Sequence, residues 1–202
     1  MRDHRNITEI AALNPDYLGF IFYPRSPRFV GNNFAIPMLS PSIKKVGVFV
    51  NESSEGILTK ATTLDLDLIQ LHGDETVDQC TQLKNEGMTI IKAFALDEDF
   101  SFSKLDAFKK VVDYFLFDTK GKFYGGNARV FNWKLLVNYD QEVPFFLSGG
   151  LSPTNMDQLG QVTSMNIHAL DFNSGVEQAP GLKSIDKVQQ AFANAPLKHE
   201  KI

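Results

Sequence analysis

The chain has 202 residues, of which 43% are hydrophobic and 22% charged, and its formal net charge is −4. This composition is typical of an ordinary folded domain, and an acidic chain without a basic stripe argues against a nucleic-acid partner. A single cysteine, Cys80, excludes a disulfide framework and a cysteine-rich metal site. No apolar stretch approaches the roughly 20 residues of a membrane span, and the N-terminus lacks the apolar region of a signal peptide. We therefore expect a cytoplasmic protein.

The chain opens with a predicted helix, for which Asp3 is a suitable N-cap and whose apolar residues Ile7 and Ile10 share one face. Seven apolar runs follow, at 17–23, 45–50, 66–72, 89–96, 113–118, 144–148 and 167–172. Most are continuous in Val, Ile, Leu and Phe, which favours strands buried on both faces of a parallel sheet. The helices predicted between and after them include 53–63, 76–86, 103–110, 153–161 and 184–193, and Ser152 is expected to cap the helix that begins at Pro153.

Regular alternation of strands and helices without a linker predicts one α/β domain over residues 1–202, a (β/α)8 TIM barrel. A closed barrel of this class needs eight strands, whereas the sequence contains seven candidates and begins with a helix. We therefore expect the first barrel strand to be missing from the chain as given and to lie before Met1.

Two glycine turns follow the last two predicted strands, Ser148-Gly149-Gly150 and Asn173-Ser174-Gly175. Glycine lets main-chain N–H groups approach an anion closely, and (β/α)8 barrels commonly hold a substrate phosphate after their last two strands. The sequence therefore predicts a phosphate site that involves Gly149, Gly150, Ser174 and Gly175.

Asp118 ends the apolar run 114–117, which places its carboxyl at the mouth of the barrel. A carboxyl beside apolar walls has a raised pKa and can donate a proton near neutral pH. Asp118 is therefore a candidate general acid, with a helix-capping or loop-bonding aspartate as the alternative.

Several segments, in order along nearly the whole chain, resemble the phosphoribosylanthranilate isomerase family of tryptophan biosynthesis. They include Gly19-Phe-Ile-Phe-Tyr-Pro-Arg-Ser-Pro-Arg28, Ile69-Gln-Leu-His-Gly-Asp-Glu75, Leu147-Ser-Gly-Gly-Leu151 and Asp171-Phe-Asn-Ser-Gly-Val-Glu177. The resemblance implies a (β/α)8 barrel that converts N-(5-phosphoribosyl)anthranilate to 1-(2-carboxyphenylamino)-1-deoxyribulose 5-phosphate by an Amadori rearrangement, without a cofactor or metal.

The resemblance also implies roles for particular residues. Asp118 matches the general acid, and Arg28 matches the residue that grips the anthranilate carboxylate. His72 and Asp171 are expected to line the substrate site, and Gly126 is expected to join the phosphate-binding residues from a loop in which 127–129 depart from the family pattern. The partner is thus a small phosphosugar, bound by a monomer or a homodimer.

The general base of this family is a cysteine in a Lys-(Ile or Val)-Cys-Gly stretch of the first strand, and Met1-Arg2-Asp3 resembles the residues directly after that stretch. Cys80 lies in a predicted helix of the outer ring and is expected to be a small buried apolar residue instead. We expect the functional protein to carry the missing strand and its cysteine. The alternatives are an impaired barrel that acts as a binding or scaffold subunit and another phosphosugar barrel, such as the histidine-pathway isomerase or indole-glycerol-phosphate synthase.

Overall fold

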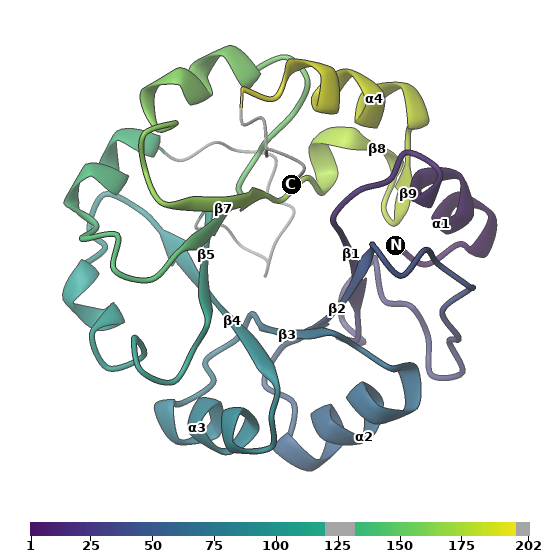
Figure 1. The fold of residues 1–202 in the computed structure, drawn as a ribbon, viewed down its shortest axis with the longest axis horizontal. Helices are drawn as coiled ribbons and strands as arrows, with labels where there is room; N and C mark the ends of the chain where they lie inside the picture. The colour runs from purple at the N-terminus through teal and green to yellow at the C-terminus, as the bar shows by residue number, and fades with distance from the viewer. Residues whose placement is uncertain (120–131, 197–202) are drawn as a thin grey trace.

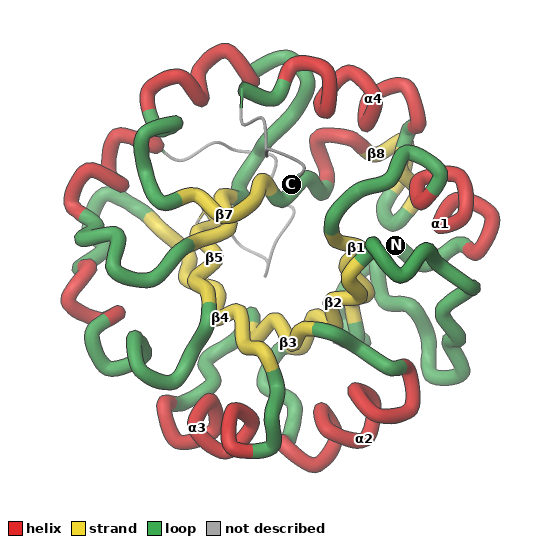
Figure 2. The backbone as a smooth tube through the Cα atoms, viewed as in Figure 1, coloured by secondary structure: helices red, strands yellow, loops and turns green. Residues whose placement is uncertain are grey.

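Seven parallel strands form one curled sheet in the computed structural model, which describes residues 1–119 and 132–196. Their spatial order is their order in the chain, from β1 to β7. Figure 1 shows the strands as a ring with the helices outside it, and Figure 2 shows the same two layers by element type. The strands are β1 (Tyr17–Ile21), β2 (Lys44–Phe49), β3 (Leu68–Leu71), β4 (Thr89–Leu96), β5 (Tyr114–Thr119), β6 (Phe145–Leu147) and β7 (Ile167–Leu170).

The ring is open between β7 and β1, because each of these two strands pairs with only one neighbour in the sheet. On the edge of β1 that faces away from β2, the main-chain nitrogen of Met1 donates to the carbonyl of Gly19 over 2.9 Å. The fold is therefore an α/β barrel of the (β/α)8 class without its first strand in the described chain. The strand here labelled β1 corresponds to the second strand of the complete barrel.

The outer layer contains four α-helices and four short 3-10 helices among the described residues. They are α1 (His4–Ala11), α2 (Ser54–Leu64), α3 (Val77–Asn85), η1 (Phe102–Leu105), η2 (Trp133–Asn138), η3 (Met156–Gln161), η4 (Ser174–Val176) and α4 (Ile185–Asn194). Asp3 caps α1 as predicted, since its carboxylate accepts from the main-chain nitrogen of Asn6 over 2.8 Å. None of these helices combines the length and apolarity that a membrane crossing needs.

Two predicted helices are shorter than expected. The segment 103–110 contains only η1, in which Phe102 packs its ring against Phe117 and Tyr139 instead of continuing a helical stripe. The helix expected from Pro153 begins at Met156, and Ser152 does not cap it. The reason is Asn155, whose side chain accepts from Ser152 N and donates to Gly150 O, and which thereby closes a turn over 150–155.

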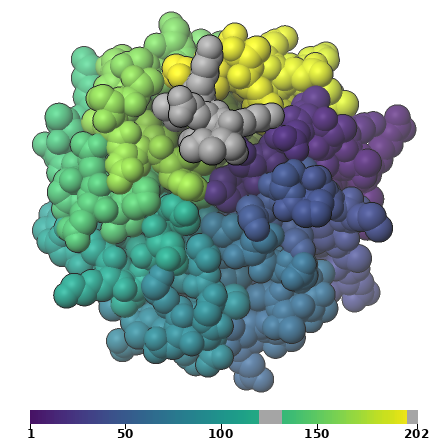
Figure 3. Space-filling view, in the orientation of Figure 1, coloured from purple at the N-terminus to yellow at the C-terminus, as the bar shows by residue number. Residues whose placement is uncertain are grey.

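A short antiparallel hairpin of β8 (Glu177–Ala179) and β9 (Leu182–Lys183), absent from the predicted elements, lies between β7 and α4. It contacts α1 through Asn6, whose side chain donates to Lys183 O and accepts from Lys183 N. The two ends of the described chain therefore meet beside the opening of the ring, as the neighbouring purple and yellow surfaces in Figure 3 show.

Side chains inside the barrel change from apolar to polar along the strands. Alternate residues of a strand point to the same face, so a residue two positions after an inward apolar residue also points inward. In four strands the apolar residue belongs to one interior cluster and the residue two positions later is polar: Leu68 and Gln70, Leu116 and Asp118, Phe146 and Ser148, and Ala169 and Asp171. A polar layer therefore covers the interior apolar layer at the carboxyl ends of the strands.

Candidate functional site

Asp118 lies in this polar layer, near the end of β5, and is only 6% exposed. Its Oδ1 accepts from the main-chain nitrogen of Thr119 over 2.7 Å, and its Oδ2 lies 3.5 Å from His72 Nε2. The side-chain nitrogen of Gln70 lies 2.8 Å from His72 Nδ1. Because an amide nitrogen can only donate, Nδ1 accepts and the Nε2 of a neutral His72 carries its proton toward Asp118. The structure thus brings together two residues that the sequence predicted separately.

A buried ion pair fixes the loop that carries His72. Glu75, in this loop, pairs with Lys92 of β4 over 2.9 Å, with side chains 0% and 3% exposed. Glu75 also accepts from the main-chain nitrogens of Asn51 and Gly73, and Lys92 donates to the carbonyl of Gly73 over 2.7 Å. These bonds satisfy both charges, so the loops after β2 and β3 are held against β4.

Asp171 directly follows β7, and its Oδ2 accepts from Ser148 Oγ over 3.1 Å. Burial raises the pKa of Asp171, and the nearby negative charge of Asp118 raises it further, while Lys183 and the Ser148 bond oppose the rise. Asp118 and Asp171 therefore face one interior space from β5 and from the end of β7. Burial and the charge of Asp118 therefore favour the neutral form of the Asp171 carboxyl.

The two glycine turns are in direct contact. Gly149 has a φ of +87°, which favours glycine, and a side chain there would meet Thr119 and lie 3.3 Å from Asp118 Oδ1. At Gly175 a side chain would collide with the carbonyl of Leu151, the residue that follows the first turn. Within the described part of the chain, the main-chain nitrogens of Gly149, Gly150, Ser174 and Gly175 donate no hydrogen bond. They are therefore available to an anion beside Asp118.

Arg28 lies in the loop after β1 and binds Glu177 of β8 through Nε and Nη2. Glu177 also contacts Lys183, and Lys183 contacts Asn173 of the second glycine turn. The predictions did not include Glu177 or Lys183 as site residues. Their sequence signal was the Pro180-Gly181 pair, which is typical of a tight turn between two short strands, with Gly181 at a φ of +82°.

Two other predictions concern residues away from these contacts. Cys80 is fully buried in α3, outside the sheet, and burial raises the pKa of its thiol to about 11. The prediction that Cys80 is a buried apolar residue of the outer ring is confirmed. Gly126 and the divergent stretch 127–129 lie outside the described residues.

Comparisons with known proteins show the family to which this chain belongs. The model of a family described as N-(5'-phosphoribosyl)anthranilate (PRA) isomerase matches residues 1–194. The N-(5'-phosphoribosyl)anthranilate isomerase of Parabacteroides distasonis is 44% identical over 193 residues, which are 94% of this chain and 87% of that protein.

Solved structures give the same result. The phosphoribosyl anthranilate isomerase of Thermotoga maritima, a dimeric enzyme, superposes with a TM-score of 0.82 at 30% identity, over 96% of this chain and 95% of that one. A phosphoribosyl anthranilate isomerase in complex with reduced 1-(o-carboxyphenylamino)-1-deoxyribulose 5-phosphate superposes with a TM-score of 0.80 at 29% identity, over 96% and 94% of the two chains.

Proposed function

Since this chain belongs to the N-(5'-phosphoribosyl)anthranilate isomerase family, we propose that its polar layer performs the Amadori rearrangement of N-(5'-phosphoribosyl)anthranilate in tryptophan biosynthesis. The observation that carries the proposal is the position of Asp118 beside Gly149, which puts a carboxyl next to a cluster of unpaired main-chain N–H groups. A phosphosugar that binds its phosphate to these N–H groups presents its ring to Asp118.

Asp118 acts as the general acid. It donates a proton to the ring oxygen of the sugar as the bond between this oxygen and C1 breaks, which leaves a protonated imine between C1 and the anthranilate nitrogen. Removal of the C2 proton then gives an enolamine, which becomes the ketone of the product when C1 gains a proton and the C2 hydroxyl loses one. The Nε2–H of His72 and the main-chain nitrogen of Thr119 hold the carboxyl group in place for the first step.

The remaining residues bind the two ends of the substrate. Gly149, Gly150, Ser174 and Gly175 receive the phosphate through main-chain nitrogens. The family resemblance adds Gly126, which lies outside the described residues, to these phosphate-binding residues. Arg28 receives the carboxylate of the aromatic ring, a task to which its planar fork is suited. Asp171 lines the site near Asp118, whose charge raises the pKa of the Asp171 carboxyl.

The base that removes the C2 proton is not Cys80, whose thiol is buried in α3 and has a pKa of about 11. In the family resemblance the base is a cysteine of the strand that pairs with the open edge of β1. An experiment can supply this strand directly, by extending the chain before Met1 with Lys-Val-Cys-Gly. The matched control extends it with Lys-Val-Ser-Gly, which restores the strand without the thiol.

Turnover is measured by the loss of N-(5'-phosphoribosyl)anthranilate. We expect the cysteine extension to exceed the serine extension by about 10²–10⁴-fold, the usual contribution of a positioned base. In the cysteine-extended protein, Asp118→Asn should lower kcat by a similar factor while the unfolding transition stays unchanged. Unchanged turnover in Asp118→Asn would remove Asp118 from the acid role, and a folded, ligand-binding but inactive cysteine-extended protein would favour the scaffold alternative.

We also propose that the protein is cytoplasmic and that it acts on its small-molecule substrate as a monomer or a homodimer. A dimer is supported by the dimeric relative of Thermotoga maritima. Light scattering across a range of protein concentrations distinguishes the two states.

A further inference from the structure

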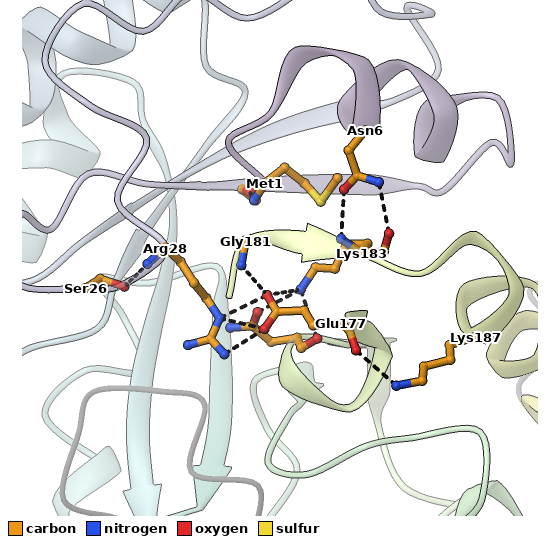
Figure 4. Close-up of polar contacts among 10 residues, drawn as sticks. Met1, Asn6, Ser26, Arg28, Glu177, Gly181, Lys183 and Lys187 are labelled. Atoms are coloured by element: carbon orange, nitrogen blue, oxygen red, sulfur yellow. Dashed lines mark hydrogen bonds and ion pairs between the residues drawn. The ribbon is translucent and has the colours of Figure 1, made fainter. Parts of the chain in front are cut away.

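Arg28 is held by a buried carboxylate that comes from the other side of the open ring. Its Nε lies 3.0 and 3.1 Å from the two carboxylate oxygens of Glu177, and its Nη2 lies 2.7 Å from Glu177 Oε2. The side chains are 12% and 5% exposed, so the pair is largely withdrawn from water. Figure 4 shows the guanidinium directed at Glu177 from the loop after β1, with Glu177 on the segment that follows η4.

This contact uses one edge of the guanidinium and leaves another edge available. A guanidinium offers five N–H groups in a fixed plane and can bind carboxylates along more than one edge. Glu177 occupies the edge made by Nε and Nη2. Within the described residues, Nη1 makes no hydrogen bond, so the edge made by Nη1 and Nη2 can receive a second carboxylate.

Glu177 is itself fixed from two other directions. Its Oε1 accepts from the main-chain nitrogen of Gly181 and from Lys183 Nζ, each over 3.0 Å. Lys183 Nζ also donates to the main-chain and side-chain oxygens of Asn173, at 2.9 and 2.8 Å. A continuous chain of bonds thus runs from Arg28 through Glu177 and Lys183 to the glycine turn that begins at Asn173.

The charges of this chain favour an anionic ligand. With Arg28 and Lys183 both protonated, the one carboxylate that they share leaves a net positive charge on the three groups, and burial lowers the pKa of Lys183 against the opposing charge of Glu177. Burial alone would raise the pKa of Glu177, but the bonds from Arg28 and the charge of Lys183 outweigh it and hold the pKa below its usual value. Glu177 is therefore ionised at neutral pH and remains a firm partner for Arg28.

We propose that Glu177 is a positioning residue, which orients Arg28 so that the free edge of its guanidinium receives the ring carboxylate of the substrate. Lys183 connects Glu177 to the glycine turn 173–175 and so fixes the position of Arg28 relative to that turn. The inference rests on the proposed function, because that function supplies the ring carboxylate. A long arginine side chain on a loop without a helix has many conformations in the absence of a partner. Glu177 removes this freedom before the ligand arrives.

The test compares two ligands in titration calorimetry. One is reduced 1-(o-carboxyphenylamino)-1-deoxyribulose 5-phosphate, and the other is the same compound with an unsubstituted phenyl ring. We expect Glu177→Gln to lower the affinity for the carboxylated ligand about tenfold, because the arginine is no longer held in place. The affinity for the other ligand should fall less than twofold. The control Glu9→Gln, at the exposed pair of Glu9 with Arg5, should change neither affinity.

A second comparison uses Arg28→Gln, which should abolish the preference for the carboxylated ligand on its own. Adding Glu177→Gln to Arg28→Gln should then cause no further change in this preference, because Glu177 acts only through Arg28. If Glu177→Gln unfolds, Glu177→Asp provides the same comparison, since its shorter side chain keeps the charge but cannot hold the same edge of Arg28.

The outcomes separate this proposal from the function on which it rests. Equal losses for both ligands, or no loss for either, would overturn the positioning role of Glu177 while leaving the substrate assignment intact. A wild-type protein that binds both ligands equally would instead contradict the carboxylate-binding role of Arg28, and the positioning role would fall with it.

Discussion

Replacing Gly149 by alanine tests how closely the glycine turn 148–150 packs against Asp118, the proposed general acid. Gly149 has a φ of +87°, and a Cβ at this position would contact Thr119 Oγ1, lie 2.8 Å from Thr119 N and lie 3.3 Å from Asp118 Oδ1. One of these neighbours is the main chain of β5, which cannot rotate away as a flexible side chain can. Either the turn or the end of β5 must therefore retreat by about half an ångström.

The magnitude follows from two contributions. A left-handed backbone costs a residue with a side chain about 1–2 kcal/mol, and overpacking in a tight site costs a further 1–3 kcal/mol or so. Gly149→Ala should therefore lower the free energy of unfolding by about 2–5 kcal/mol. In the cysteine-extended protein, a displacement of half an ångström at Asp118 should also lower kcat/KM by roughly tenfold, because about 1 Å of misplacement costs about 10²-fold.

Two other glycines separate these contributions. Gly87 has a φ of +82° and open space where a Cβ would stand, so Gly87→Ala should show the backbone cost alone, about 1–2 kcal/mol. Gly160 has open space and an ordinary φ, so Gly160→Ala should stay within about 0.5 kcal/mol of the wild type. Urea unfolding gives the stabilities, and titration with the reduced product analogue gives the affinities. A Gly149→Ala protein that loses no more stability than Gly87→Ala, with unchanged ligand affinity, would refute the contact between the turn and β5.

Two further predictions concern buried charges. Because the pKa of Asp171 is raised above 3.8, its protonated form stabilises the folded state at low pH, and this stability is lost as the pH rises from 3.8 through the raised value. Asp171→Asn should therefore raise the Tm at pH 7, and in a series of thermal melts this gain should shrink to nothing below pH 3.8. The same variant should bind the ligand more weakly. A gain in Tm that does not depend on pH would contradict the raised pKa of Asp171. Lys92→Met leaves Glu75 buried without its partner and should cost about 3–5 kcal/mol in urea unfolding, and adding Glu75→Gln should recover part of the loss. A double variant no more stable than Lys92→Met would mean that the pair is not the source of the cost.

The strands were predictable because their signal is local. A parallel strand buried on both faces reads as a continuous apolar run, and β4 begins and ends where the sequence predicted. The site residues Asp118 and Asp171 were also predictable from the sequence, since each polar side chain follows an apolar run at the end of a strand. These positions could not reveal the contact between Asp118 and His72, which depends on the curl of the sheet.

The contacts of Arg28 with Glu177 and with the hairpin of Lys183 could not be predicted from the sequence in this way. Arg28 and Glu177 are separated by 149 positions in the sequence, and no local pattern pairs them. The strands β8 and β9 have three and two residues, too few to show an alternation, so only the Pro180-Gly181 turn marked the hairpin. The helix expected over 153–161 begins late for a similar reason, because the side chain of Asn155 closes a turn that the proline signal does not reveal.

The proposed function requires that the carboxyl ends of the strands bind a phosphosugar that carries an aromatic carboxylate. A crystal structure of the protein with reduced 1-(o-carboxyphenylamino)-1-deoxyribulose 5-phosphate is the sharpest test of this requirement. We expect the phosphate on the main-chain nitrogens of Gly149 and Ser174 and the carboxylate on the free edge of Arg28, with the sugar beside Asp118. A phosphate bound away from both glycine turns would contradict the proposal.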